Sequence, residues 1–299
     1  MAHSALPLAL RRALSLPALA WRHWHGLREA AAVRRRPIPD DLWKRTLLRH
    51  PFLLRRSAQD MAELRRMTSL FLDRKEFSAV GGLRLTDMMA VTVAAQAVLP
   101  VLHLGLARYD GFVGIVLHAD AVRAPREQAD DDGVVHSWEE PLAGEAMQGG
   151  PLMLSWRDVR MGGRIRGRSD SGSGAAYNVV IHEFAHVLDM EDGLADGAPL
   201  LPPDLPATEW ARALQAAFQQ FMARQQSEEC STATAAAAEP GGSLDPYAAE
   251  GPEEFFAVAS EAFFVTPRAL KAEHPVLYGV FQRFYRQDPA SEPGADALD

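Results

Sequence analysis

Three residues in the middle of the chain have the types and spacing of a hydrolytic metal centre: His182, Glu183 and His186 form the pattern H-E-x-x-H. On an α-helix, positions i and i+4 lie on one face, so both imidazoles can reach one metal ion. Neutral histidine nitrogens suit Zn2+, and Glu183 can take a proton from a water molecule whose pKa zinc lowers to about 7. The pattern therefore predicts one Zn2+ per chain, with Glu183 as the general base.

Apolar residues surround this pattern and favour a functional interpretation over coincidence. A helix with such flanks is buried, and burying two imidazoles and a carboxylate without partners is costly. The alternative is a pair of core histidines with satisfied hydrogen bonds and an unrelated glutamate. The flanking apolar residues are Val179, Val180, Ile181, Phe184, Val187 and Leu188.

A catalytic zinc site needs a third protein ligand, and three acidic residues are candidates. Asp192 follows His186 by six residues, which is the spacing of the last ligand in a metzincin. That arrangement needs a sharp turn, usually at a glycine, where this chain has Asp189. Glu254 and Glu261 lie in the later run P-E-E-F-F-A-V-A-S-E.

Acidic residues can also support a metal ligand by hydrogen-bonding to it, and the candidates are one of Glu254 and Glu261, and Asp189. Glu254 and Glu261 are seven residues apart and share a helix face, so one can bind the metal while the other hydrogen-bonds to a ligand. Asp189 lies seven residues after His182 and can accept the outer N–H of an imidazole. Spacing alone leaves these alternatives open.

The charge distribution is uneven along the 299 residues, whose formal net charge is −8. Residues 1–56 carry 12 Lys or Arg against 3 Asp or Glu, and the rest of the chain carries 19 against 36. A basic arm on an acidic body can contact nucleic acid or membranes. The arm has no recognisable DNA-binding motif and no regularly spaced aromatic residues, so we expect no direct nucleic-acid binding.

The cysteine content and the apolar segments indicate a cytoplasmic protein. Cys230 is the single cysteine, so an intramolecular disulfide is excluded and a reducing compartment is favoured. Arg11 and Arg12 interrupt the apolar start, which is too broken for a signal peptide, although its Arg-rich composition also suits a transit peptide. The longest apolar stretch, Met88–Leu102, is shorter than the ~20 residues of a membrane span.

Helical periodicity and capping residues predict the elements that must position the histidines. Ser57 and Thr86 are expected N-caps, and Asp40 and Asp41 after Pro39 open an earlier helix. The apolar spacing predicts helices over 57–75, 86–99, 176–190, 208–228, 251–265 and 274–287.

The middle of the chain has the pattern of short buried strands. Val113–His118, Val134–Glu139 and Pro151–Trp156 are predicted strands, the last of them as a cleft edge that pairs with an extended peptide. The Gly/Ser/Arg-rich segment 161–175 is predicted to be a mobile loop.

Helices that flank a few strands indicate the α+β class, mostly helical with a small mixed sheet. We expect a basic, flexible N-terminal arm over residues 1–36 and a single catalytic domain over 37–288. A low-complexity insertion at about 229–243 and a disordered tail over 289–299 complete the predicted organisation.

Several of these runs together resemble Mlc titration factor A, a family of bacterial gluzincin-like zinc peptidases. They are H-E-F-A-H-V-L-D-M, D-P-Y-A-A-E-G-P-E-E-F-F-A-V-A-S-E-A-F-F and F-Q-R-F-Y-R-Q-D-P. The resemblance extends from about Leu83 to Pro289 and includes D-G-F at Asp110–Phe112 and G-P-L-M-L-S-W at Gly150–Trp156. It implies a zincin-like core.

The resemblance also implies site residues and partners. It makes Glu254 the third zinc ligand and Tyr247, seven residues earlier, a catalytic tyrosine whose O–H stabilises the oxyanion. Members of the family act on small aminoacyl and peptide substrates, which implies aminopeptidase-type activity, and they sequester the glucose repressor Mlc. Two alternatives remain: a zinc-containing binding protein that sequesters a repressor with little or no catalysis, and a metzincin-like peptidase with Asp192 as ligand.

Overall fold

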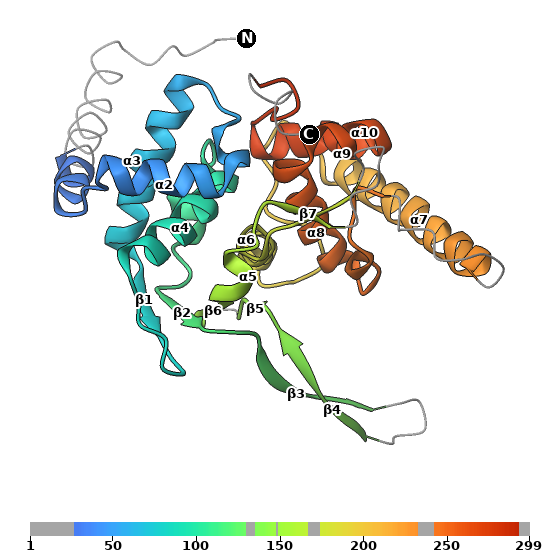
Figure 1. Cartoon of the computed structure of the whole chain (residues 1–299). Helices are drawn as coiled ribbons and strands as arrows, with labels where there is room; N and C mark the ends of the chain where they lie inside the picture. Colours follow the sequence, from blue (N-terminus) through green and yellow to red (C-terminus); the bar gives the residue numbers. More distant parts are fainter. Residues whose placement is uncertain (1–26, 130–134, 148, 167–173, 233–241, 293–299) are drawn as a thin grey trace, which may run out of the picture.

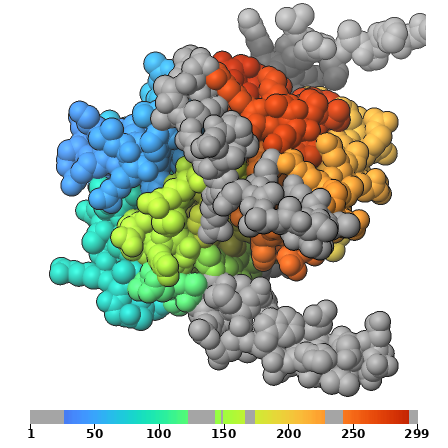
Figure 2. All heavy atoms as spheres, turned by 45° about the vertical axis from the view of Figure 1, so that its right-hand side comes forward, coloured from blue at the N-terminus to red at the C-terminus, as the bar shows by residue number. Residues whose placement is uncertain are grey.

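The computed structural model describes residues 27–129, 135–147, 149–166, 174–232 and 242–292. These residues are mostly helical with one small mixed sheet, which confirms the predicted α+β class. Figure 2 shows the N-terminal part of the chain, in blue to teal, and the C-terminal part, in orange to red, on either side of the lime-coloured middle of the sequence. That middle region contains the H-E-x-x-H helix.

The sheet has the strand order β1 (Glu76–Ala79), β2 (Gly114–His118), β6 (Leu152–Ser155) and β5 (Gly144–Glu145). β1, β2 and β6 are parallel, and β5 is antiparallel to β6. The prediction that Pro151–Trp156 is an edge strand is wrong, because β6 has a neighbour on each side. The edge strand on this side of the sheet is the two-residue strand β5, and β1 forms the other edge.

A long hairpin that the sequence did not predict explains why Pro151–Trp156 is not an edge strand. β3 (Val122–Ala129) and β4 (Val135–Leu142) pair antiparallel and project from the body of the molecule (Figure 1). The strand predicted over Val134–Glu139 is confirmed, but its partner β3 was not predicted, because V-R-A-P-R-E-Q-A contains proline and several charges. The end of β4 brings the chain back beside β6, where β5 forms.

The predicted helices are confirmed with small changes at their ends. The Ser57 Oγ accepts the backbone N–H of Asp60 at 3.0 Å, and the Thr86 Oγ1 accepts that of Met89 at 3.4 Å, as N-caps do. The helix predicted over 274–287 is preceded by a short helix that was not predicted. The helices are α2 (Asp40–Arg49), α3 (Ala58–Arg74), α4 (Asp87–Val98), α5 (Trp156–Val159), α6 (Val179–Asp189), α7 (Ala207–Thr232), α8 (Pro252–Val265), α9 (Pro267–Glu273) and α10 (Pro275–Tyr285).

The prediction of a loop over 161–175 is wrong at both ends. β7 (Arg164–Arg166) pairs antiparallel with β8 (Ala175–Tyr177), while residues 167–173 lie outside the described residues. Backbone hydrogen bonds make this pair, so a Gly/Ser/Arg-rich composition does not prevent it. Because β8 occupies residues 175–177, α6 begins at Val179 rather than at 176.

Helix α6 lies at the centre of the fold, packed against α4, α8, β5 and β6. Its Phe184 ring is fully buried, with its centroid 5.7 Å from that of Phe71 and 4.9 Å from that of Tyr109. On the other side of α8, Trp210 stacks on Phe281 at 5.3 Å. Aromatic packing on both sides therefore fixes the two helices that carry the candidate site.

The ends of the predicted domain are described in part. Residues 27–35, within the predicted arm, are helical, and the Arg35 Nη2 lies 2.6 Å from Asp73 Oδ2 on α3. α7 extends to Thr232, while 1–26, 233–241 and 293–299 lie outside the described residues. The domain boundaries stay a prediction. No helix in the described residues is both long and apolar enough to cross a bilayer.

Candidate metal centre

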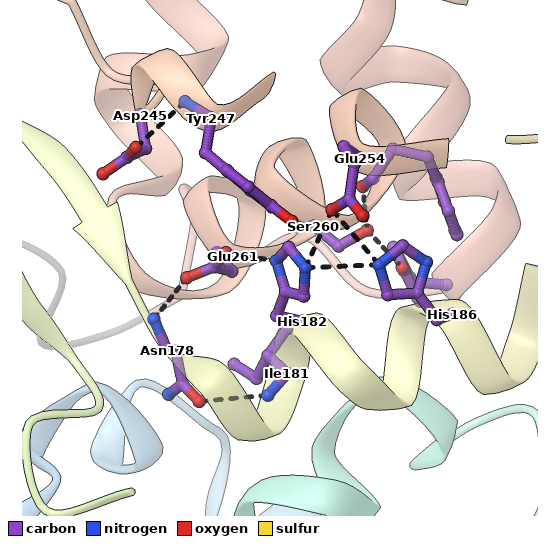
Figure 3. Close-up of polar contacts among 11 residues, drawn as sticks. Asn178, Ile181, His182, His186, Asp245, Tyr247, Glu254, Ser260 and Glu261 are labelled. Carbon is purple, nitrogen blue, oxygen red and sulfur yellow. Dashed lines mark hydrogen bonds and ion pairs between the residues drawn. The ribbon is translucent and has the colours of Figure 1, made fainter. Parts of the chain in front are cut away.

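Three side chains from two helices converge on one point (Figure 3). The Nε2 atoms of His182 and His186, on α6, lie 3.2 Å apart. The Oε2 atom of Glu254, in the first turn of α8, lies 3.0 Å from His182 Nε2 and 3.3 Å from His186 Nε2. The three potential ligand atoms thus form a nearly equilateral triangle.

This triangle fits a tetrahedral metal ion. Ligand atoms that lie about 2.0–2.1 Å from a tetrahedral zinc ion are about 3.3–3.4 Å from one another, close to the separations found here. Two imidazoles and one carboxylate are also the donor set of many catalytic zinc sites, with the fourth position left for water. In the described part of the chain, no other group of His, Cys, Asp or Glu side chains brings three ligand atoms together in this way.

Glu261 orients the first of the two imidazoles. Its Oε1 lies 2.8 Å from the Nδ1 of His182, so the ring can donate its Nδ1–H to the carboxylate and turn its Nε2 lone pair to the triangle. Burial alone lowers the pKa of His182, but Glu254 and Glu261 outweigh this and raise the pKa well above its usual value.

Glu254 is held among positive or potentially positive groups. It follows Pro252, which opens α8, so the carboxylate lies at the positive end of the helix dipole. Burial raises the pKa of the Glu254 carboxyl, but hydrogen bonds with His182 and His186 outweigh burial and bring the pKa well below its usual range. The carboxylate is therefore ionised, as a metal ligand must be.

Glu183 lies beside the triangle, with only 5% of its surface exposed. Its carboxylate accepts a hydrogen bond from the backbone N–H of Ala146, just after β5. Burial raises the pKa of the Glu183 carboxyl, and the two histidines oppose this only in part. A carboxylate with a raised pKa is suited to taking up a proton and giving it back.

Tyr247 faces the ligand cluster from a third element of the chain. It lies in the short 3-10 helix Pro246–Ala249, where the Asp245 Oδ1 accepts its backbone N–H at 3.1 Å. Its ring centroid is 5.9 Å from that of His182, and the phenol points toward the ligand cluster (Figure 3). A phenol there can donate a hydrogen bond to a substrate oxygen.

The chain also matches known proteins over most of its length. Residues 21–286 match the family described as glucose-regulated metallo-peptidase M90. The chain belongs to this family. It is 40% identical over 208 residues to Mlc titration factor A of Edwardsiella ictaluri, covering 69% of this chain and 72% of that relative. The protein of the same name from Salmonella gallinarum is 34% identical over 250 residues, covering 83% of this chain and 87% of that relative.

The remaining acidic candidates of this M90 peptidase lie elsewhere. Asp192 is exposed, and its Oδ1 accepts the backbone N–H of Leu194 at 3.1 Å, so the described geometry gives no support to a metzincin-like site. Asp189 is buried, but it holds a loop instead of an imidazole: its Oδ2 accepts the N–H of Gly197 at 2.9 Å, and its Oδ1 has no hydrogen-bond partner within the described part of the chain. Of the two candidates for supporting a ligand, only Glu261 contacts a histidine.

Two contributors to the site were not predicted. A Cβ atom on Gly144 would lie 2.5 Å from the Glu183 Oε1, so only glycine lets the edge strand approach this carboxylate. Asn178 caps α6, because its Oδ1 accepts the N–H of Ile181 at 3.0 Å. An asparagine just before the apolar run was the signal available in the sequence for the cap, whereas Gly144 carried none.

A cleft of about 490 Å3 leads to the site. β5 contributes one wall through Gly144, and Tyr247 contributes another. Its lining also includes Ala121, Ala143, Arg157, Asp158, Tyr177, Val179, His182, Glu183, Asp245, Val258 and Glu261. The cleft is large enough for a few residues of an extended peptide or for a small aminoacyl substrate.

Proposed function

We propose that this M90 metallopeptidase is a zinc enzyme that hydrolyses peptide or aminoacyl amide bonds, with His182, His186 and Glu254 as the metal ligands. The observation that carries this proposal is the triangle of ligand atoms with sides of 3.0–3.3 Å beside a buried glutamate. A zinc ion held there would lower the pKa of water and polarise the carbonyl group of a substrate.

The chain's own groups would move the protons. The Glu183 carboxylate, fixed by the Ala146 N–H, would accept a proton from water as the water oxygen bonds to the substrate carbon. The same carboxyl would give that proton to the amine nitrogen as the C–N bond breaks. The Tyr247 phenol would donate a hydrogen bond to the carbonyl oxygen while that oxygen carries negative charge.

The edge strand β5 would orient the substrate. An extended peptide can add to the edge of a sheet by backbone hydrogen bonds, and β5 is the edge strand beside Glu183. Aminopeptidase-type cleavage is the finer proposal, and the family resemblance supports it. A chromogenic aminoacyl amide should therefore be cleaved faster than its N-acetylated form, and the opposite preference would indicate an endopeptidase.

Metal analysis of the purified protein tests the ligand assignment. Wild type should contain about one zinc per chain, and Glu254→Ala should lose most of it because two protein ligands are too few for this kind of site. Glu250→Ala changes a nearby exposed glutamate and should keep the metal. Zinc retained by Glu254→Ala would exclude this residue as a ligand.

Glu183→Gln separates chemistry from metal binding. The variant should retain zinc while peptide hydrolysis falls by at least about 10²–10⁴-fold, which is the usual contribution of a general base. The change keeps the shape of the side chain, so the cleft should stay intact. Hydrolysis at the wild-type rate would contradict the assigned base.

A second candidate function is repressor binding, and the name of the relatives, Mlc titration factor A, favours it. A zinc-stabilised module that sequesters a transcription repressor would need the fold but not the general base. Glu183→Gln should then still bind a Mlc-like repressor in a pull-down, while a purely enzymatic effect on the repressor would disappear. A cytoplasmic location and the absence of direct nucleic-acid binding stay predictions from the sequence.

A further inference from the structure

A chain of buried hydrogen bonds leads from the metal ligands to the far side of α6. Its members are Glu261 on α8, Asn178 at the start of α6, and Gln96 on α4. Glu261 is 4% exposed, and Asn178 and Gln96 are completely buried. Three helices that are distant in the sequence are thus joined by polar groups that water does not reach.

Asn178 is the branching point of this chain. Its Oδ1 accepts the Ile181 N–H at 3.0 Å, and its Nδ2 donates to the Gln96 Oε1 at 2.8 Å. Its backbone N–H donates to the Oε2 of Glu261 (Figure 3). Since Glu261 uses its other oxygen for His182, the position of Asn178 decides where that carboxylate, and therefore the imidazole, can lie.

Among the described residues, the Gln96 Oε1 is the hydrogen-bond acceptor for the Asn178 Nδ2. The Nε2 of Gln96 donates to the Thr92 carbonyl oxygen at 3.2 Å. Without the Gln96 oxygen, a buried N–H group of Asn178 would lose its hydrogen-bond partner, which is unfavourable. The asparagine would then rotate toward another acceptor and lose its cap on α6.

Gly162 packs closely against the hydrogen bond between Asn178 and Gln96. A Cβ atom at this position would lie 2.8 Å from the Gln96 Oε1 and 3.3 Å from the Asn178 Nδ2. The Gly162 carbonyl oxygen also accepts a hydrogen bond from the buried His50 Nδ1 at 2.9 Å. A side chain at position 162 would therefore press on the hydrogen bond between Gln96 and Asn178.

We propose that Gln96 is a positioning residue for His182, acting through Asn178 and Glu261. It fixes the orientation of the Asn178 side chain, which caps α6. The cap sets the position of the Asn178 backbone N–H, which holds the Glu261 carboxylate against the outer nitrogen of the imidazole. The part of this inference that concerns metal affinity rests on the proposed zinc function. The part that concerns the orientation of the imidazole does not.

Metal affinity separates this role from ordinary core stabilisation. Gln96→Met keeps the length of the side chain but removes the acceptor, and should raise the zinc dissociation constant about 10-fold, the lower end of what loss of an outer partner of a ligand causes. Val98→Ala removes volume from the same helix, two positions away, and should change the constant less than twofold. Competition with a chelator measures the zinc dissociation constant of wild type, Gln96→Met and Val98→Ala.

Two more variants guard against a simple loss of folding. Gly162→Ala leaves every polar group of the chain in place, yet it should weaken zinc binding in the same direction by pushing between Gln96 and Asn178. In a Glu261→Ala background, Gln96→Met should weaken zinc binding no further, because its path to His182 is already cut. Equal constants for Gln96→Met and Val98→Ala would overturn the proposal.

A measurement on the metal-free protein keeps the two proposals distinguishable. In protein with ¹⁵N-labelled histidine, the Nδ1–H signal of His182, assigned by its absence from His182→Gln, should be protected in wild type and in Val98→Ala. It should be lost by exchange in Gln96→Met. If wild type bound no zinc and the signal behaved in this way, the proposed function would fail while the positioning role stood. An unchanged signal in Gln96→Met would overturn the role.

Discussion

The two sides of the cleft are built differently. On the ligand side, His182, His186 and Glu254 come from two long buried helices, and their side chains are 12%, 14% and 19% exposed. On the substrate side, β5 is two residues long, and Tyr247 lies in a short 3-10 helix with 43% of its surface exposed. The groups that would hold the metal are fixed from several directions, whereas those that would meet the substrate are accessible.

This difference matches the two tasks. A metal site needs ligands held near one geometry before the metal arrives, and buried hydrogen bonds supply that order. A substrate side needs open edges and groups that adjust when a peptide enters, so it is built from short elements with fewer buried contacts. The comparison predicts that changes on the substrate side reduce turnover but spare metal binding.

The largest such effect should come from Gly144→Ala. The new Cβ would lie within 2.7 Å of three atoms of the Glu183 side chain, so either the carboxylate or β5 must move. We expect the rate constant kcat to fall by about 10²–10³-fold, as for a displaced general base, with the zinc content unchanged.

Gly111→Ala is the matched control, because a Cβ there meets nothing within 4 Å. Steady-state kinetics and metal analysis on both variants test the prediction. Loss of zinc from Gly144→Ala would mean that the two sides of the cleft are not separable.

Tyr247→Phe should have the next largest effect. In the proposed mechanism this change removes one hydrogen-bond donor to the oxyanion, so kcat should fall by about 10²-fold while KM and zinc content stay near wild type. Tyr177→Phe is a suitable control from the same cleft, since the Tyr177 hydroxyl donates to Asp158 Oδ1 at 2.8 Å instead of facing the ligands. A large rise in KM with kcat unchanged would make Tyr247 a binding residue rather than a catalytic one.

The same contrast explains what the sequence could predict. The ligand side depends on helices, whose apolar period, caps and H-E-x-x-H spacing are local properties, so α6 and α8 were predicted within a few residues. Glu261 shares a helix face with Glu254, and its support of a ligand was among the predicted alternatives, although the sequence did not predict that this ligand is His182. Residues seven positions apart lie on the same face of a helix, so their spacing in the sequence already predicts that they lie close together.

The substrate side depends on contacts between distant segments, and no local pattern encodes them. β5 is an edge only because the β3–β4 hairpin returns the chain beside β6, and β3 lacks the composition of a strand. Gly144 matters because it faces a carboxylate 39 positions later in the chain, and a lone glycine gives no sign of that. Asp189 shows that a shared helix face does not by itself predict a contact. It lies seven residues after His182 on α6, yet its carboxylate accepts the N–H of Gly197 and not that of an imidazole.

The smallest expected effect concerns the carboxylate of Asp189, which lies on the ligand side. Burial raises the pKa of the Asp189 carboxyl from its usual value of 3.8 to about 6, so the folded protein binds a proton more tightly than the unfolded chain. Between pH 7 and pH 5 the folded state therefore takes up this proton first, and its stability should rise by about 1 kcal/mol as the pH falls. Asp189→Asn cannot titrate and should lack this gain.

Chemical unfolding of wild type and Asp189→Asn at pH 7 and pH 5 measures the difference, because all other titrating groups are shared and cancel. Zinc should be removed from both proteins first, since protonation of metal ligands over the same range would otherwise dominate. The same pH dependence in the two proteins would show that the Asp189 carboxyl takes up no proton between pH 7 and pH 5. The prediction that burial on the ligand side raises the pKa of Asp189 into this range would then be wrong.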